Sequence, residues 1–380
     1  MKHSFRIILG LLLLAIPLCI NAQEQVDRTP KISGFVQGLY QANLNSEGEL
    51  TSNTLRMRRV RMSIDGKLTK NLSYKIQGDF SRSPMLVDAY VKYKACDAFA
   101  IQIGQFKTPF SLESPINPVN LEVFDYGESI QNLVGYGDVC GVGGLGRDLG
   151  VMATGELFRP EGKDFAIVNY AIGVFNGNGP NALDNNNRKD IVGRLEIHPM
   201  LKDLTLSGSY YYGLYRNKDV EAEMKKIENN EYVWGDKLSL DEFNNGTRNR
   251  WSAGIQYNDG DLVIRGEFLN GTTDYVNITN DTANMKVTNT PMVCQSIGYY
   301  GVAGYNFKFG KENSQKLMPV LRYEHFAKNK EIINSGTNYY TVGINYWPVK
   351  SLNIKLDYSF IQQESGKNEH RIVGIVSYKF

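Results

Sequence analysis

The chain has 380 residues, of which 42% are hydrophobic and 22% are charged, so it is too apolar for a disordered protein. Lysine and arginine total 42 against 40 aspartate and glutamate residues, which gives a formal charge of +2. Both excess cations lie in the first 22 residues, which contain no acidic residue, so the remainder is neutral. A neutral chain excludes non-specific nucleic-acid binding through bulk positive charge, and we expect no nucleic-acid partner.

The N-terminal residues have the pattern of a signal peptide. Lys2 and Arg6 precede an apolar run of 14 residues, and a small residue follows it. Such a run is too short for a membrane-spanning helix, which needs about 20 residues. A membrane anchor and a lipid-modified Cys19 are the alternatives, although no small residue precedes that cysteine. We predict three parts in chain order: a signal peptide at 1–22, a short periplasmic segment at 23–31 and an outer-membrane β-barrel at 32–380.

From residue 32 onward, apolar residues recur at every second position. The segment 72–82, for example, places Tyr74 and Ile76 on one face and Lys75 and Gln77 on the other. This period over about ten residues predicts β-strands. Sixteen segments show it: 32–42, 54–68, 72–82, 85–95, 99–106, 148–158, 164–176, 190–198, 203–215, 248–258, 261–272, 294–309, 317–326, 337–347, 351–363 and 368–380.

The connections between these segments alternate in length. Every second connection is short, whereas the other set contains the long segments 43–53, 107–147, 177–189, 216–247 and 273–293. Short turns at one rim, long loops at the other and an even strand count predict an antiparallel β-barrel in the outer membrane, surrounded by lipid. A soluble β-sandwich shows the same alternation, but the strand lengths and the many outward tyrosines favour the barrel. Cys96, Cys140 and Cys294 are too widely spaced for a disulfide framework or a metal site.

The same alternation assigns charged side chains to the lumen. Val60, Met62 and Ile64 mark the lipid side of the second strand, so Arg59 and Arg61 face inwards. The other basic residues placed inside are Lys75, Lys92, Lys94, Arg194, Arg265, Arg322, Lys355 and Arg371. Arginine binds two oxygens of an anion at once, and weak sites in a row permit conduction. Each cation can instead pair with a lumen carboxylate such as Asp79, Asp88, Glu196, Glu267, Glu324 or Asp357 and stiffen the wall.

The connection 107–147 is rich in proline, glycine and apolar residues, which is unusual for a loop in water. Loops longer than about 15 residues are usually functional or disordered. We expect this third extracellular loop to fold into the pore and form a constriction with Phe110, Glu113 and Phe124. A surface lid or a contact between subunits is the alternative. The polar loop 216–247 carries no chemistry that we can assign.

No motif indicates a cofactor, a metal or an enzyme. The glycine-rich segment 141–147 lacks the Lys-Ser/Thr ending of a phosphate-binding loop, and 184–190 lacks the spacing of a calcium loop. Beyond the leader, His198, His325 and His370 lie far apart in the sequence. A Ser–His pair of an outer-membrane enzyme is the remaining catalytic alternative, and no specific motif supports it.

Two long stretches resemble a known family. They are LRMRRVRMSIDGKLTKNLSYKIQGDFS at 55–81 and LVDAYVKYKACDAFAIQIGQFKTPFSLES at 86–114, followed by GRDLGV at 146–151. This part of the chain is similar to the opening of the phosphate-selective porin O and P family, and IGQFKTPFSLE is the most specific segment.

The resemblance implies a sixteen-stranded barrel, a homotrimer and an anion-conducting pore lined by arginine and lysine. Its matching basic positions are Arg59, Arg61, Lys75 and Lys107. We therefore expect a porin for small hydrophilic solutes that prefers anions such as phosphate; a general or oligosaccharide-conducting porin is the alternative. The last strand ends in Phe380, which is typical of outer-membrane barrels and predicts recognition by their assembly machinery.

Overall fold

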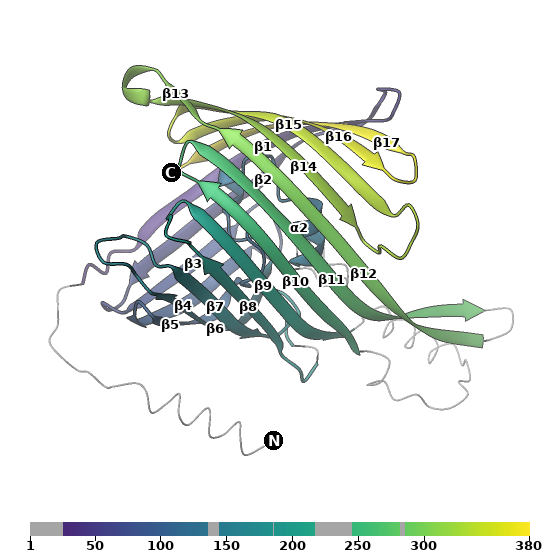
Figure 1. Cartoon of the computed structure of the whole chain (residues 1–380), viewed down its shortest axis with the longest axis horizontal. Helices are drawn as coiled ribbons and strands as arrows, with labels where there is room; N and C mark the ends of the chain where they lie inside the picture. The colour runs from purple at the N-terminus through teal and green to yellow at the C-terminus, as the bar shows by residue number, and fades with distance from the viewer. Residues whose placement is uncertain (1–25, 136–143, 185, 217–244, 282–285) are drawn as a thin grey trace, which may run out of the picture.

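The computed structural model describes residues 26–135, 144–184, 186–216, 245–281 and 286–380. The expected signal peptide at 1–22, Cys140 and nearly all of the loop 216–247 lie outside the described residues. The described strands form one antiparallel sheet in which β1, Lys31–Leu44, pairs with both β2, Leu50–Lys67, and β17, Asn368–Lys379. The sheet is therefore closed into a barrel of tilted strands (Figure 1).

The remaining elements follow one another around the barrel. The first half contains β3 Leu72–Asp79, β4 Leu86–Cys96, β5 Phe99–Lys107, η1 Pro118–Asn120, α2 Glu128–Leu133, β6 Arg147–Leu157, β7 Val168–Phe175, β8 Asp190–Ile197 and β9 Leu204–Arg216. The second half contains β10 Asn245–Asn258, β11 Leu262–Asp281, β12 Lys286–Tyr305, β13 Phe307–Phe309, η2 Lys311–Asn313, β14 Gln315–Ala327, β15 Gly336–Val349 and β16 Leu352–Gln363.

The short strand β13 continues β12 beyond Asn306, because both pair with β14 along the same edge. When β12 and β13 are counted as one strand, the wall has sixteen strands, which confirms the predicted sixteen-stranded antiparallel barrel. Closure leaves no open sheet edge, as a β-structure surrounded by lipid requires. The short turns gather at one rim, which we call the short-turn rim, and the long loops gather at the opposite, long-loop rim.

Burial in the barrel is inverted relative to a water-soluble protein. On the outside, the apolar residues Ile103 and Val342 are at least half exposed. On the inside, the polar residues Arg265 and Ser377 are almost completely buried. An apolar exterior and a polar interior are the pattern of a barrel in a membrane. In the described part of the chain, no helix is both long enough and apolar enough to span a membrane.

The prediction that residues 273–293 form a long connection is wrong. The backbone pairing of β11 with β12 continues from Asp274 opposite Val293 to Asp281 opposite Lys286, so most of that segment is a two-stranded ribbon. The ribbon extends beyond the barrel at the long-loop rim (Figure 1). The segment is rich in threonine and valine, which favour strands, but it lacks the polar–apolar alternation on which the prediction relied.

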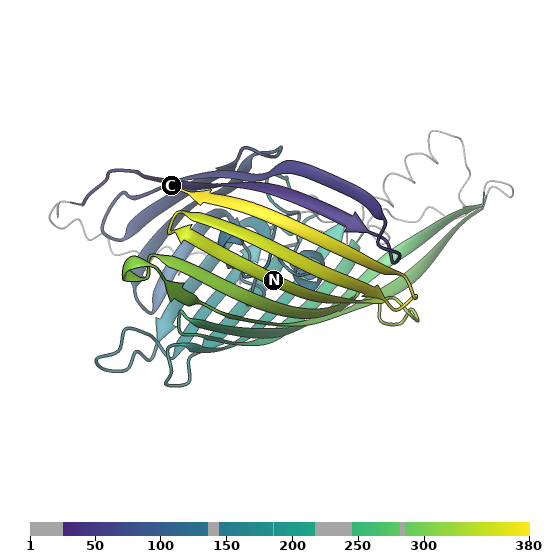
Figure 2. The same ribbon diagram turned by 90° about the horizontal axis from the view of Figure 1, so that it is seen from above.

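The described residues 108–135 and 144–146 lie between β5 and β6 and belong to the third loop, which we call L3. Helix α2 of this loop lies inside the barrel in both views (Figures 1 and 2). The apolar side chains of L3 pack against inward residues of the wall and create a hydrophobic core within the bore. Its loop members include Phe110, Leu121, Val123, Ile130 and Leu133, and its wall members include Phe175, Val192, Tyr211, Leu269, Val302 and Val320.

Candidate functional site

The position of L3 against the wall determines where the bore is open. Phe110 is fully buried, and its ring meets that of Tyr211 edge-on with 6.0 Å between the centroids. The expected constriction residue Phe110 therefore lies in the core between loop and wall and not at the edge of an open bore. The loop contacts the inner face of the wall from β8 to β16, where sequence alternation alone predicted exposed polar side chains.

Glu113 fixes L3 electrostatically to the wall. Its carboxylate lies 2.6 Å from the Arg322 guanidinium and 3.6 Å from that of Arg265, and it also accepts a hydrogen bond from the Gly127 amide at 3.1 Å. Burial alone would raise the pKa of Glu113, but the two arginines lower it below its ordinary value. Glu122, also on L3, forms a second ion pair with Arg265.

Three further wall residues hold the loop. Glu324 accepts hydrogen bonds from the backbone amide and the hydroxyl of Ser129, at 2.8 and 2.6 Å, at the start of α2. Glu267 accepts from the Leu112 amide at 2.9 Å. Lys355 is buried and donates to the carbonyl of Leu121. The loop is therefore anchored by three residues that alternation assigned to the pore lining, Arg265, Arg322 and Lys355. Alternation predicts which face of the wall a side chain lies on, but not which residue it contacts.

A β-bulge brings two adjacent arginines into the lumen. In the pairing of β1 with β2 the register shifts so that Arg58 has no opposite residue, and both Arg58 and Arg59 point inwards. Both form ion pairs with Asp125 of L3, and the Arg59–Asp125 distance is 3.0 Å. Burial would raise the pKa of Asp125, but Arg58 and Arg59 lower it below its ordinary value. Bulges commonly re-aim side chains near functional sites.

Phe124, which precedes Asp125, lies between two guanidinium groups. Its ring centroid is 5.4 Å from the Arg58 guanidinium and 4.7 Å from that of Arg371 on β17. Both distances are within the range of a cation–π interaction. The tip of L3 is thus held by arginines from β2 and β17, which lie on either side of β1.

Part of the wall from β2 to β6 borders a cavity that L3 leaves open. Arg61 pairs with Asp79 at 2.9 Å, and Arg147, at the start of β6, pairs with Asp88 of β4 at 2.7 Å. Lys107, at the end of β5, donates to the Ile116 carbonyl at 3.2 Å and to the Tyr126 hydroxyl at 2.9 Å. These contacts orient the cations beside a cavity of about 320 Å³. Arg61, Lys75, Asp88, Tyr90, Lys107 and Arg147 are among its lining residues.

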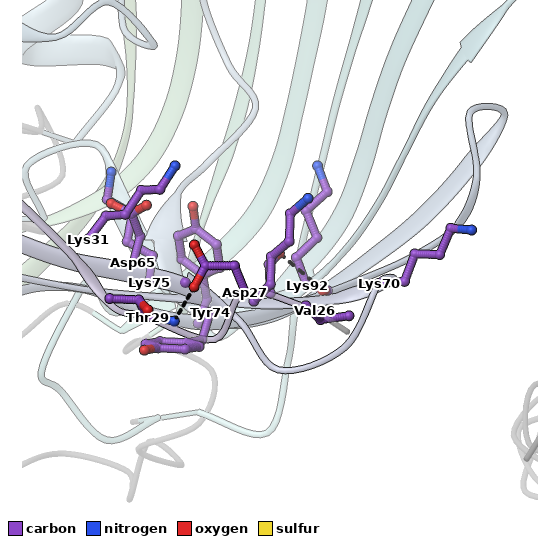
Figure 3. A pocket seen from close by; sticks show the side chains of 13 residues that line it. Val26, Asp27, Thr29, Lys31, Asp65, Lys70, Tyr74, Lys75 and Lys92 are labelled. Atoms are coloured by element: carbon purple, nitrogen blue, oxygen red, sulfur yellow. Dashed lines mark hydrogen bonds between the residues drawn. The ribbon is translucent and has the colours of Figure 1, made fainter. Parts of the chain in front are cut away.

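A second cavity, of about 700 Å³, continues from the first to the short-turn rim, since Lys75 and Tyr90 line both. Its lysines are Lys31, Lys67, Lys70, Lys75 and Lys92, and its carboxylates are Asp27 and Asp65. The side chains of Lys31, Lys75 and Lys92 point in the same direction, into this cavity, whereas the Tyr74 ring points away from them (Figure 3). The charged side chains of the lining are therefore mainly basic.

Two predicted pore residues have other positions. Lys94 is half exposed beside the β4–β5 turn, where it pairs with Asp97 at 2.6 Å, so it lies at the short-turn rim rather than along the bore. Arg194 on β8 pairs with Glu196 at 3.2 Å and donates to the Ser111 carbonyl of L3 at 3.1 Å. Alternation along β4 places Lys94 on the inner face, but the residue lies too close to the end of the strand to face the bore.

The sequence prediction missed Arg58, Asp125 and Arg147. Strict alternation directs Arg58 to lipid. The only signal against this was the presence of four arginines, Arg56, Arg58, Arg59 and Arg61, within six residues, too many charges for one of them to face lipid. Asp125 and Arg147 were treated as parts of a loop. Of the three histidines beyond the leader, His198 contacts Asn169, the Leu204 carbonyl and the Thr205 hydroxyl. His325 contacts Asn338, and His370 contacts Tyr358.

Comparison with known proteins agrees with this architecture. The chain resembles an anion-selective porin from Comamonas acidovorans, with 13% identity, 93% of this chain and 100% of that chain covered, and a TM-score of 0.60. It resembles the outer membrane channel DcaP of Acinetobacter baumannii, with 14% identity, 95% and 99% coverage and a TM-score of 0.58.

A trimer form of OmpT from Vibrio cholerae matches with 11% identity, 93% and 100% coverage and a TM-score of 0.57. At these identities the structures show a shared fold only. No curated protein matches the chain. The family model for phosphate-selective porin O and P matches residues 31–372, so the chain belongs to this porin family.

Proposed function

We propose that this protein is a homotrimeric porin of the bacterial outer membrane through which small hydrophilic solutes diffuse passively, with a preference for anions such as phosphate. Family and fold support an outer-membrane channel. The signal peptide at 1–22 would direct export. Strand β17 and the outward, half-exposed Phe380 that follows it would be recognised by the barrel assembly machinery.

One observation carries the anion preference. Along the part of the bore that L3 leaves open, five lysines face two aspartates in the cavity of about 700 Å³. In the adjoining smaller cavity, of about 320 Å³, the four cations Arg61, Lys75, Lys107 and Arg147 lie beside one carboxylate, Asp88. A basic lining attracts anions and repels cations before they are fully dehydrated. Because the lysines are spread along the path, each site is weak enough to release its ion.

The acidic residues of L3 strengthen this asymmetry. Glu113, Glu122 and Asp125 are all engaged with arginines, so the loop presents few unpaired carboxylates to the path. On the far wall, beneath the loop, the cations Arg265 and Arg322 are compensated in the same way. We infer that the lysines of the cavity beside β1 to β4 determine the sign of the field on this side of the bore.

Reversal potentials in planar bilayers test the proposal. Under a KCl gradient the wild-type channel is expected to show an anion-selective sign, and added phosphate is expected to reduce the chloride current. Combined Lys75→Gln and Lys92→Gln substitutions are expected to move the reversal potential towards zero, whereas Lys163→Gln, in the exposed β6–β7 turn, is the charge-matched control. Cation selectivity in the wild type would refute the anion claim. Anion selectivity without phosphate competition would favour a general porin.

A further inference from the structure

A short segment that precedes the barrel reaches the mouth of the larger cavity. Residues 26–30, which we call the N-terminal arm, lie before β1 and have no regular secondary structure. Three residues of the arm, Val26, Asp27 and Thr29, are among those that line the cavity of about 700 Å³. The arm therefore borders the same space as the lysines of β1, β3 and β4 (Figure 3).

The two carboxylates of this cavity have different surroundings. Asp65, on β2, lies directly opposite Lys31 of β1 and directly opposite Lys75 of β3 in the strand pairing. Opposite residues on adjacent antiparallel strands have Cβ atoms about 5 Å apart, so the charge of Asp65 is compensated within the wall. Asp27 is not part of the wall, because it is exposed and borders the cavity from the arm. Its charge is therefore added to the lining by the arm.

The attachment of the arm holds this charge near the wall. The Asp27 carboxylate accepts a hydrogen bond from the Thr29 backbone amide at 2.9 Å, which closes a turn between side chain and backbone. Pro30 follows, and its ring fixes φ at about −65° and restricts Thr29 to extended conformations. Lys31, the next residue, begins β1. Asp27 is thus connected to the barrel by a short segment with few accessible conformations.

Asp27 is ionised at neutral pH. The hydrogen bonds from Thr29 contribute most to a pKa below the ordinary value of the carboxyl group, and the charge of Lys31 lowers the pKa further. The lining therefore carries five lysines and two charged aspartates, a net formal charge of three positive. Without the charge of Asp27, the net formal charge would be four positive.

From this geometry we propose that Asp27 is a selectivity-determining residue that limits the anion preference of the channel. The proposal rests on the proposed anion-preferring porin and adds a residue that sets the strength of that preference. A carboxylate beside the path repels an anion and attracts a cation through the water between them. Since Lys75 and Tyr90 line both cavities, an ion that moves from the smaller cavity to the short-turn rim passes the arm. A weaker attraction at this mouth lets an anion leave, as conduction requires.

Reversal potentials in planar bilayers test the role of this charge. Asp27→Asn removes the charge but keeps the turn, because the asparagine side chain accepts the same hydrogen bond from Thr29. At about 0.1 M KCl we expect Asp27→Asn to raise the anion-to-cation permeability ratio roughly two- to threefold. Asp27→Glu keeps the charge and is expected to keep the wild-type ratio. Asp164→Asn, in the exposed β6–β7 turn at the same rim, is the charge-matched control.

The salt dependence shows whether Asp27 acts through water. At 1 M KCl the Debye length is about 3 Å, so the difference between Asp27→Asn and the wild type is expected to vanish. A difference that persists undiminished at 1 M would contradict an action at a distance and overturn the proposal.

The remaining outcomes separate this proposal from the channel itself. Equal ratios for Asp27→Asn and an anion-selective wild type would refute the role of Asp27 and leave the porin in place. An increase of the same size in Asp27→Glu or in Asp164→Asn would show that the effect does not come from a charge on the arm, and would refute the role of Asp27 as well. A wild type that does not conduct would refute the channel and this proposal together.

Discussion

Glu113 is the charged residue of L3 whose removal should loosen the loop most. Its carboxylate is fully buried between Arg322 and Arg265, and each of these arginines has one other carboxylate partner, Glu324 and Glu122 respectively. Removing one member of a buried charged network leaves the others undercompensated, which costs more than the same change at the surface. This residue therefore contributes both to the position of the loop and to the charge balance beneath it.

We predict that Glu113→Gln weakens the docking of L3 by about 2 kcal/mol, the usual scale for a lost charge-assisted hydrogen bond. Single-channel recordings should show larger and noisier currents, and the heat-induced unfolding band shift on gels should occur at a lower temperature. Glu161→Gln, in the exposed β6–β7 turn, is the control. A variant with wild-type noise and wild-type heat stability would show that the loop is held by its apolar contacts alone.

Asp125 should weaken anion binding, because it already occupies Arg58 and Arg59. We predict that Asp125→Asn increases the affinity for phosphate, seen as half-saturation of the current at a severalfold lower concentration. The pKa of Asp125 is lowered below its ordinary value of about 3.9, so its carboxylate stays charged at pH values at which a free aspartate is already protonated. The stabilisation from this clamp is therefore constant from pH 5 to 8 and is lost only in stronger acid. Half-saturation unchanged by the substitution would contradict this role, with Asp97→Asn as control.

At this scale the sequence gives the direction of a side chain more reliably than its partner. Alternation placed Arg61 and Lys75 in the lumen, where both line a cavity. It could not show that Arg322 lies beneath L3, because that depends on contacts between residues more than 200 positions apart. Arg58 was missed because a bulge, which adds one residue to a strand, reverses the phase of everything on one side of it.

Among the elements, L3 is held chiefly by apolar packing within the bore. In a loop surrounded by water, the side chains of Phe110, Ile130 and Leu133 would be exposed at a cost in free energy. In L3 they are fully buried against the wall. The composition of 107–147 therefore predicted inward folding for a physical reason, the burial of apolar surface. The strands themselves were predictable because lipid on one side and water on the other impose a strict period of two.

We predict that Phe110→Ala destabilises the docked loop by roughly 3–4 kcal/mol, the range for emptying a buried phenylalanine site. The folded barrel should remain, because its strand pairing does not involve this ring, but L3 should become susceptible to added protease and the open-channel current should rise. Phe307→Ala, at a half-exposed outward position on β13, is the matched control. Equal protease resistance in both variants would show that Phe110 does not anchor the loop.

The ribbon formed by β11 and β12 shows where element prediction ends. In its eight additional residue pairs, the backbone groups of the two strands hydrogen-bond to each other. In this ribbon, neither strand has lipid on one side and the lumen on the other. The period of two therefore disappears from the sequence although the strands continue. Only the high content of β-branched residues remained as a signal, and it does not distinguish such a ribbon from a polar loop.

For the whole molecule, the positions of the charged side chains matter more than the net charge. The chain beyond residue 22 has equal numbers of basic and acidic side chains, yet its open path is lined by more cations than anions. Many carboxylates are engaged elsewhere, in L3 and in wall pairs such as Arg61–Asp79 and Arg147–Asp88. Selectivity in a neutral barrel thus depends on which charges remain solvated along the path, a property that composition cannot show.

Ionic strength provides the test at this scale. The lysines of the larger cavity line an open space of about 700 Å³ and act on an ion through water, so salt should screen them. The Debye length is about 10 Å at 0.1 M and about 3 Å at 1 M. We therefore predict that the anion-to-cation permeability ratio falls severalfold between these salt concentrations. In the Lys75→Gln and Lys92→Gln variant the ratio should start lower and change less. A ratio that is independent of salt would instead locate the selectivity in a narrow contact site, at Arg59, Arg61 and Arg147, where the ion touches the guanidinium groups directly.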